Sequence, residues 1–327
     1  LVIQQPGSWV SLDGNQLVVR TAEGEEDRVG LESVSQLVLM GSVSITTPAL
    51  HRCLDDLIPV VFLSGGGWFY GYARGLSHKN CALRVLQYEK ARDPDTRSSV
   101  NATLVANKIA NCRTLLRRNG KVPTEVLDQL SRLSASARSC RDDELLLSLE
   151  GQAARLYFQH FASMLKNEAA LSFAFEDRHR RPPTDPVNAL LSFVYTLLLK
   201  DWTITLETVG FDPFFGFYHA PRHGKPALAL DLMEPFRPVV AESVVITLLN
   251  NRELAPKDFI EREGACLIRA EARKKVVQAY LRRLMSEISH PVFGYRVTYR
   301  RLFEIHARLF ARYLFGEIPN PPEFQIR

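Results

Sequence analysis

Apolar and polar residues alternate, or form short apolar runs between turn residues, from position 9 to about position 74. Such runs are typical of strands in a half-buried sheet. They predict strands over 9–12, 17–19, 36–40, 43–46, 60–63 and 68–72, with a short helix over 48–57. Because Asp13-Gly-Asn separates the first two runs, we expect a hairpin there. The chain therefore begins with a small β-rich domain.

From position 79 onward the apolar residues recur at three- and four-residue steps, the period of a helix. This spacing predicts helices over 79–91, 100–118, 125–136, 142–166, 187–209, 239–250, 267–289 and 299–315. Asp93-Pro94 ends the first of them, because proline does not propagate a helix. The whole pattern predicts an α+β protein: a small N-terminal β-rich domain (1–77), a connecting helix and linker (78–96), and a larger, mostly α-helical domain (97–327).

Length and charge narrow the class of protein. At 327 residues the chain is long for one hydrophobic core, which favours two domains. Lys and Arg total 41 against 36 for Asp and Glu, so the formal net charge is +5. A clustered surplus indicates a polyanionic partner, most simply nucleic acid, whereas a dispersed surplus is only a solvated basic surface.

Cysteine usage and hydropathy favour the cytoplasm. The five cysteines are odd in number, widely spaced and without a C-x-x-C pair, which argues against disulfides and a structural zinc. No apolar run reaches the roughly 18–20 residues that a membrane span requires, and no secretory leader opens the chain. We therefore expect a cytoplasmic protein without membrane association. Because the chain starts at Leu1 and not at a methionine, we also expect an upstream region in the native product.

Three acids and one imidazole stand out as candidate chemistry. Asp231-Leu-Met-Glu234-Pro-Phe-Arg-Pro sets two carboxylates three residues apart, and one helical turn would align both on one face. Glu150 lies within an apolar helical stripe, where either an arginine or a metal ion has to compensate its charge. His219 ends an aromatic run and is either a satisfied core histidine or a ligand. Carboxylates and an imidazole without a thiolate favour Mg²⁺ or Mn²⁺ over zinc.

Basic residues come in clusters along the sequence. The candidates for DNA binding are Arg178, Arg180, Arg181, Arg222, Lys225, Arg269, Arg273 and Lys274. A solvated outer face is the ordinary reading of such clusters, but charges that border the acids would bind phosphates without reading sequence. Asn188 is a supporting candidate: its amide either bonds a ligand carboxylate or a metal-bound water, or caps and packs its own helix.

Four segments carry a resemblance to a known family. They are Glu150-Gly-x-Ala-Ala-x-x-Tyr-Phe, Arg181-Pro-Pro-x-Asp-Pro-Val-Asn-Ala-Leu-Leu-Ser-Phe193, Gly210-Phe-Asp-Pro-x-x-Gly-Phe-x-His219 and the octapeptide that begins at Asp231. In this order and over most of the chain, they resemble the CRISPR-associated spacer-acquisition integrase, the catalytic subunit of the CRISPR adaptation complex. The shared order makes the match more specific than any one motif.

The resemblance implies a metal-dependent DNA integrase and endonuclease that inserts short DNA fragments into a CRISPR array by 3′-hydroxyl transesterification. It implies catalytic roles for Glu150, His219, Asp231 and Glu234. Three of them, Glu150, His219 and Glu234, are the implied ligands of Mg²⁺ or Mn²⁺. Asp231 then supports the site or contacts the metal transiently. Many relatives have aspartate at the position of Glu234, which leaves the geometry of the site open.

The resemblance also implies partners. These are double-stranded DNA (the fragment and the array), a second copy in a homodimer formed through the β-rich domain, a small non-catalytic companion subunit, and an iron–sulfur trimming nuclease that is fused or separate.

Two other functions stay open. One is a metal nuclease that cuts branched DNA in repair with water as nucleophile, and the other is a non-enzymatic DNA-binding scaffold whose acids pair with arginines. Joined strands among the products distinguish the integrase from the nuclease.

Overall fold

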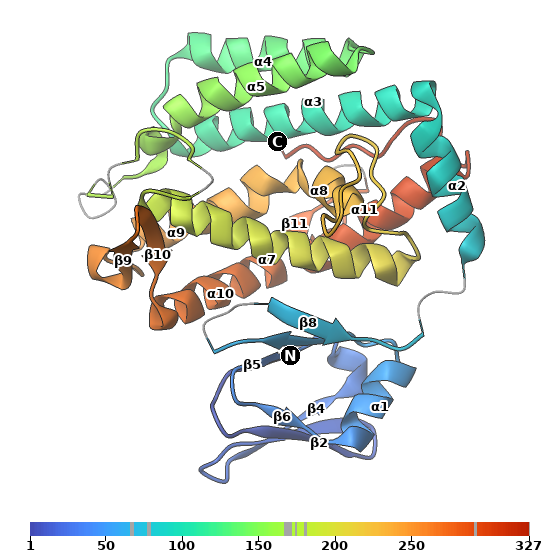
Figure 1. Ribbon diagram of the computed structural model, residues 1–327, viewed down its shortest axis with the longest axis vertical. Helices are drawn as coiled ribbons and strands as arrows, with labels where there is room; N and C mark the ends of the chain where they lie inside the picture. The colour runs from blue at the N-terminus through green and yellow to red at the C-terminus, as the bar shows by residue number, and fades with distance from the viewer. Residues whose placement is uncertain are drawn as a thin grey trace. The chain divides into compact units, whose positions relative to one another are not determined.

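A computed structural model describes residues 1–65, 69–76, 80–166, 172–173, 175–179, 182–290 and 293–326 (Figure 1). The chain divides into two compact units, Leu1–Ser77 with Arg269–Lys274 and His78–Ile268 with Lys275–Arg327. The predicted fold class is confirmed, since a β-rich N-terminal region precedes a mostly helical one.

Within its described residues, the first unit holds two four-stranded sheets, with the orders β1-β5-β7-β8 and β4-β3-β2-β6. Their strands are β1 (Val2–Ile3), β2 (Trp9–Asp13), β3 (Gln16–Arg20), β4 (Glu26–Gly30), β5 (Leu37–Met40), β6 (Ser44–Ile45), β7 (Val60–Leu63) and β8 (Phe69–Ala73), and the helix α1 spans Thr47–Asp55. The core of this unit contains the fully buried side chains of Val10, Leu17, Leu37 and Val60. All four lie in the apolar runs from which the strands were predicted.

The predicted hairpin is confirmed: β2 and β3 pair antiparallel, and Gly14 turns the chain with a φ of 56°. Two strands of this unit were missed. The strand β1 has two residues, and β4 is a mostly exposed edge strand rich in charged residues that shows no apolar period. Its Glu26 pairs with Arg20 on the neighbouring strand, so ion pairs cover this edge. Position 68, where we expected the last strand to begin, lies outside the described residues.

The second unit is built from helices. They are α2 (Cys81–Arg92), α3 (Pro94–Asn119), α4 (Thr124–Ser139), α5 (Asp143–Gln159), α7 (Pro186–Val209), α8 (Ala227–Met233), α9 (Ser243–Asn250), α10 (Ala270–Met285, whose first turn belongs to the other unit) and α11 (Tyr299–Leu314). The long helix α3 packs along α4 and α5 (Figure 1). A π-helical segment, η3 (Arg237–Glu242), runs directly into α9 and also packs against α3.

Capping residues explain where the central helices begin. Asp93 accepts a hydrogen bond from the backbone N–H of Thr96 at 3.0 Å, and Pro94 then starts α3 at a position where no N–H donor is required. The proline therefore opens a helix six residues earlier than predicted and leaves a single residue between α2 and α3. Asp185 and Pro186 start α7 in the same way, and Gly210 ends it with a φ of 112°.

Some expected helices are shorter than predicted. The helix predicted over 142–166 ends at Gln159 and is followed by a 3₁₀ turn, η2 (Phe161–Met164). The helix predicted over 267–289 is wrong at both ends, where the chain forms β10 (Ala265–Ile268) and β11 (Glu287–Ser289). These strands pair with β9 (Phe259–Arg262) and β12 (Arg296–Thr298) as short hairpins. The apolar residues of 267–289 recur at helical steps through both ends of this range, so the two flanking strands were read as part of one helix.

Helix α7 is the one helix in the described part of the chain that is long and apolar enough to span a membrane by length and composition. Most of its apolar window is buried inside the protein, which is how the core helix of a soluble protein passes the same test. Its Leu190, Leu191 and Val194 are fully buried.

Candidate active site

Glu150 lies on α5 and faces α3 across a cleft. Its Oε1 is 2.5 Å from the ammonium of Lys108, and its Oε2 accepts a hydrogen bond of 2.5 Å from the hydroxyl of Tyr218. Burial alone would raise the pKa of Glu150, but the charge and hydrogen bond of Lys108 outweigh it and lower this pKa to about 2. We expected an arginine or a metal ion to balance the charge of Glu150, and in the structure a lysine balances it.

Glu234 follows the last residue of α8 and is buried beside the same lysine. Its Oε2 is 2.7 Å from Lys108 Nζ, and its Oε1 is 3.1 Å from the guanidinium of Arg237. Burial opposes ionisation, yet the charges of Arg237 and Lys108 hold the pKa of Glu234 below its ordinary value. Glu150 and Glu234, which are far apart in the sequence, therefore meet as two carboxylates around one ammonium.

Asp231 points away from Glu234, although the two are one helical turn apart. Its Oδ2 accepts the backbone N–H groups of Phe217 at 2.6 Å and Tyr218 at 3.0 Å, and its Oδ1 accepts that of His219 at 2.9 Å. The same Oδ1 is 2.7 Å from His219 Nδ1. A carboxylate at this position selects the tautomer with hydrogen on Nδ1 and leaves Nε2 as the ligating nitrogen. Asp231 is therefore a positioning residue for the histidine.

The three candidate ligands line one polar cleft of about 650 Å³. Glu150 comes from α5, His219 from the loop before α8, and Glu234 from the end of α8. Lys108 and Arg237 lie in the same wall, and Arg222 and Lys225 lie at the rim. Side chains separated by 84 positions in the chain thus share one recess. Among the described residues, its lining holds four acids, an imidazole and four basic groups, since Asp143 and Glu144 of α5 also line it.

A family comparison decides what kind of protein carries this cleft. The family model for CRISPR-associated protein Cas1 matches residues 1–282. A CRISPR-associated endonuclease Cas1 of Thermus thermophilus is 38% identical over 98% of this chain and 95% of its own length. The chain belongs to the Cas1 family.

Other Cas1 relatives agree. A Cas4 exonuclease/Cas1 endonuclease fusion of Geobacter sulfurreducens is 45% identical over the whole chain, which spans 60% of the length of that fusion, less than two thirds. Among solved structures, a Cas1-containing chain of a partial Cas6-RT-Cas1–Cas2 complex is 26% identical, with a TM-score of 0.74 over 100% of this chain and 98% of that chain. The resemblance found in the motifs is thus confirmed at the level of the Cas1 family.

The donor set of this Cas1 chain fits a hard divalent cation. Two mostly buried carboxylates already bracket one cationic nitrogen at 2.5 and 2.7 Å. Oxygen and imidazole donors suit Mg²⁺ or Mn²⁺. In the described part of the chain, however, no group of three or more His, Cys, Asp or Glu side chains is already arranged around a common ion position. Lys108 lies between the two carboxylates instead.

The side-chain amide of Asn188 bonds residues of the preceding loop and of its own helix start. Its Nδ2 donates to the carbonyl of Asp177 at 2.8 Å and to Asp185, and its Oδ1 accepts from Arg178 Nη1 and from the backbone of His179. These bonds tie the preceding loop to the first turn of α7 and use both ends of the amide. The expectation that Asn188 bonds a ligand carboxylate is therefore replaced by the capping and packing role.

The basic candidates fall into separate places. Arg222 and Lys225 line the cleft, whereas Arg178 packs on the ring of Tyr195, 5.6 Å from its centroid, and bonds Ser192. Arg180 and Arg181 lie outside the described residues. Arg269, Arg273 and Lys274 belong to the other compact unit, so the described geometry does not connect them with the cleft. Lys274 pairs with Glu271 on its own helix.

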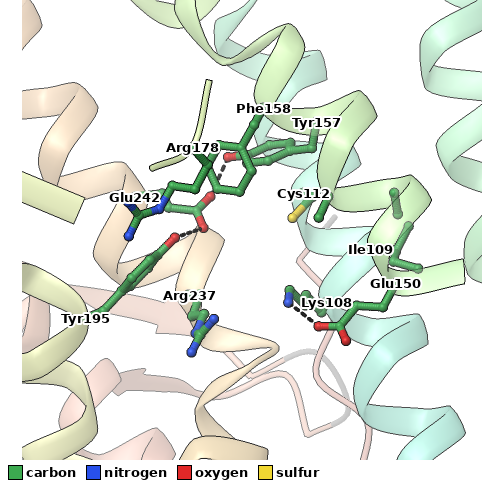
Figure 2. Close-up of a pocket in the computed structure, with 12 residues that line it drawn as sticks. Lys108, Ile109, Cys112, Glu150, Tyr157, Phe158, Arg178, Tyr195, Arg237 and Glu242 are labelled. Atoms are coloured by element: carbon green, nitrogen blue, oxygen red, sulfur yellow. Dashed lines mark hydrogen bonds and ion pairs between the residues drawn. The ribbon is translucent and has the colours of Figure 1, made fainter. Parts of the chain in front are cut away.

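Three contributors were not predicted: Lys108, Tyr218 and Arg237. Figure 2 shows Lys108 on α3 and Glu150 on α5 facing each other, with Arg237 projecting from the π-helical segment. A lysine within the buried face of α3 is the signal that sequence reasoning overlooked, since a buried ammonium needs an acidic partner. Arg237 lies inside the octapeptide that begins at Asp231, but the sequence analysis assigned it no function.

A small cavity of about 20 Å³ adjoins the cleft and contains a second buried acid, Glu242 (Figure 2). Its Oε2 accepts the hydroxyl of Tyr157, and its Oε1 accepts that of Tyr195 at 2.6 Å. Burial raises the pKa of Glu242 above its ordinary value despite these two bonds. Arg237 lies over the ring of Tyr195, 4.8 Å from its centroid, and so connects this network with Glu234.

Proposed function

We propose that this chain is the catalytic part of a divalent-metal-dependent DNA integrase and endonuclease, which inserts short DNA fragments into a CRISPR array. Membership of the Cas1 family supports the reaction class. The single observation that carries the site is the convergence of Glu150 and Glu234 on one cation, with His219 in the same cleft. We assign these three residues as the ligands of Mg²⁺ or Mn²⁺.

The protein groups then have distinct tasks. Asp231 orients His219 through Nδ1, and Tyr218 fixes Glu150 through its hydroxyl. When bound, a divalent cation polarises the scissile phosphate and lowers the pKa of the attacking hydroxyl. Arg222 and Lys225 at the rim neutralise the phosphates of the incoming DNA and contribute affinity without base recognition.

The attacking group in this proposal is the 3′-hydroxyl of the DNA fragment. A transesterification proceeds by in-line displacement at phosphorus, so no side chain has to form a covalent intermediate. The reaction conserves one phosphodiester: the bond to the fragment forms as the bond within the array strand breaks, and the array's own 3′-hydroxyl leaves. A hydrolytic nuclease with water in place of the fragment uses the same site and remains the second candidate.

The experiment incubates the protein and a companion subunit with a labelled short duplex and a supercoiled array plasmid, with and without Mg²⁺. We expect label joined to the plasmid only with the metal. Alanine in place of Glu150, His219 or Glu234 should abolish joining. Glu317→Gln is the matched control, because Glu317 is a surface partner of Arg312. Cut but unjoined plasmid supports the hydrolytic nuclease, and full joining by the three variants rejects the site.

The proposal extends to partners. Double-stranded DNA is the substrate, a second copy pairs through the β-rich unit, and a Cas2-type companion joins the assembly in the cytoplasm. The solved complex that contains both Cas1 and Cas2 supports the companion. A Cas4-type trimming nuclease, fused or separate, is supported by the fusion in Geobacter sulfurreducens. Sedimentation of the purified protein with and without the companion tests the stoichiometry.

A further inference from the structure

Lys108 lies at the point where the two candidate carboxylate ligands meet. It projects from the buried face of α3, and its side chain is 14% exposed. Its Nζ is 2.5 Å from Glu150 Oε1 and 2.7 Å from Glu234 Oε2, so one ammonium bridges acids from two other elements. Distances of this size are those of charge-assisted hydrogen bonds.

The local charges are balanced as the side chains stand. Glu150 and Glu234 contribute two negative charges, and Lys108 and Arg237 contribute two positive ones. A divalent ion added between the carboxylates would leave this group with a surplus of two positive charges. An ammonium and a metal ion also cannot share one position between the same two oxygens. Occupancy by the one therefore opposes occupancy by the other.

We propose that Lys108 is a resident counter-cation that holds Glu150 and Glu234 in ligand positions before metal binds and that the metal ion displaces. This inference rests on the ligand set of the proposed function. Lys108 borders both the cleft and the small cavity beside Cys112, so the displaced ammonium has space on either side of its present position. The lysine keeps two buried acids close together, which their mutual repulsion would otherwise oppose.

Competition gives a direct expectation for metal affinity. At about 4 Å and an effective dielectric constant of about 20, removing one competing positive charge changes a Coulomb energy by several kcal/mol. Partial relaxation of the carboxylates reduces this effect. We therefore expect Lys108→Met, which keeps all but the last atom of the side-chain length and removes the charge, to bind Mn²⁺ at least about tenfold more tightly than the unmodified protein.

The matched control is Lys200→Met. Lys200 is also a buried lysine, paired with Asp201 at 3.3 Å on α7, and it is not among the side chains that line the cleft. Both variants should lower the thermal stability of the metal-free protein, because each removes a positive charge that balances a buried carboxylate. Only Lys108→Met should change the dissociation constant for Mn²⁺, measured on the full chain without DNA by the electron paramagnetic resonance of free Mn²⁺.

A second measurement uses the unmodified protein, in case Lys108→Met does not fold. The rate of reductive methylation of Lys108, followed by mass spectrometry, should rise severalfold when Mn²⁺ is added, because displacement frees the ammonium. Lys200 is the internal reference, and its rate should not change. An unchanged or slower rate at Lys108 would overturn the inference, as would unchanged or weaker Mn²⁺ binding by a folded Lys108→Met variant.

Failure of this inference is distinct from failure of the proposed function. If Glu150→Ala and Glu234→Ala abolish Mn²⁺ binding while Lys108→Met leaves it unchanged, the ligand set stands and the competition is rejected. If neither glutamate variant affects Mn²⁺ binding, the ligand set itself is wrong, and the role of Lys108 falls with it.

Discussion

Asp231→Asn tests how the cleft obtains a correctly oriented histidine. The carboxylate of Asp231 is fully buried and accepts three backbone N–H groups, and it also faces His219 Nδ1. An amide of the same shape has one oxygen and one NH₂ group. The least costly orientation keeps the oxygen toward Phe217 and Tyr218 and turns the NH₂ group toward His219.

This orientation has two consequences. The backbone N–H of His219 loses its acceptor, and an unsatisfied donor of this kind costs about 1–3 kcal/mol of stability. The NH₂ group donates to Nδ1, which reverses the ring tautomer and moves the hydrogen to Nε2. The nitrogen that we assign to the metal is then blocked, although the fold is kept.

The assay is two-dimensional ¹H–¹⁵N NMR of the imidazole rings, because the ¹⁵N shifts distinguish a protonated ring nitrogen from an unprotonated one. A His219→Gln spectrum identifies the signal. We expect the Nδ1–H tautomer in the unmodified protein, the Nε2–H tautomer in Asp231→Asn, and a loss of about 1–3 kcal/mol in urea unfolding. A variant that keeps the Nδ1–H tautomer would refute the positioning role of Asp231.

Three further predictions concern single side chains. Burial lowers the pKa of His306 to about 3. Between about pH 6.5 and this value the unfolded chain binds a proton at His306 that the folded chain does not, so the free energy of unfolding falls as the pH falls. His306→Leu should remove this contribution, which is up to about 1.4 kcal/mol per pH unit between pH 6 and pH 4, as measured by urea unfolding. Phe324→Ala, which empties a site 1% exposed, should cost about 3–5 kcal/mol in the same assay, whereas Phe315→Ala at a site 47% exposed should change stability by under about 0.5 kcal/mol. Gly216→Ala places a Cβ 2.7 Å from Asp231 Oδ2 and should lower stability by about 1–3 kcal/mol and disturb the His219 signal; a thermal unfolding midpoint equal to that of the unmodified protein would contradict this contact.

The sequence predicts the larger elements of this fold because their signals are local. Helix α7 shows its capping aspartate and proline, its apolar length and its terminal glycine within one stretch of chain. The hairpin of β9 and β10 was missed, because its turn depends on Glu263 and Gly264 at positive φ, 52° and 74°, between strands of four residues. The strand β9 has two adjacent apolar residues followed by two charged ones, so it shows no alternation that would mark a strand.

The candidate ligands were predictable as a set, but their neighbours were not. Glu150, His219 and Glu234 carry family motifs, whereas Lys108 has meaning only after α3, α5 and the end of α8 are packed together. The three-residue spacing of Asp231 and Glu234 suggested that both acids lie on one face of a helix. The helix α8 ends at Met233, however, and Glu234 belongs to the turn that follows it. Long-range packing therefore decides which acid lines the cleft beside Glu150 and which one bonds the histidine.

The π-helical segment explains how Arg237 and Glu242 reach the same tyrosine. Arg237 is its first residue and Glu242 its last, and both engage Tyr195: the guanidinium lies over the ring, and the carboxylate accepts the hydroxyl. On a regular α-helix, five steps of about 100° would place the two side chains about 140° apart. The i→i+5 bonding of a π-helix brings them toward one face. Tyr195 therefore contacts both ends of the π-helical segment. This contact holds in place the guanidinium of Arg237, which balances the charge of Glu234.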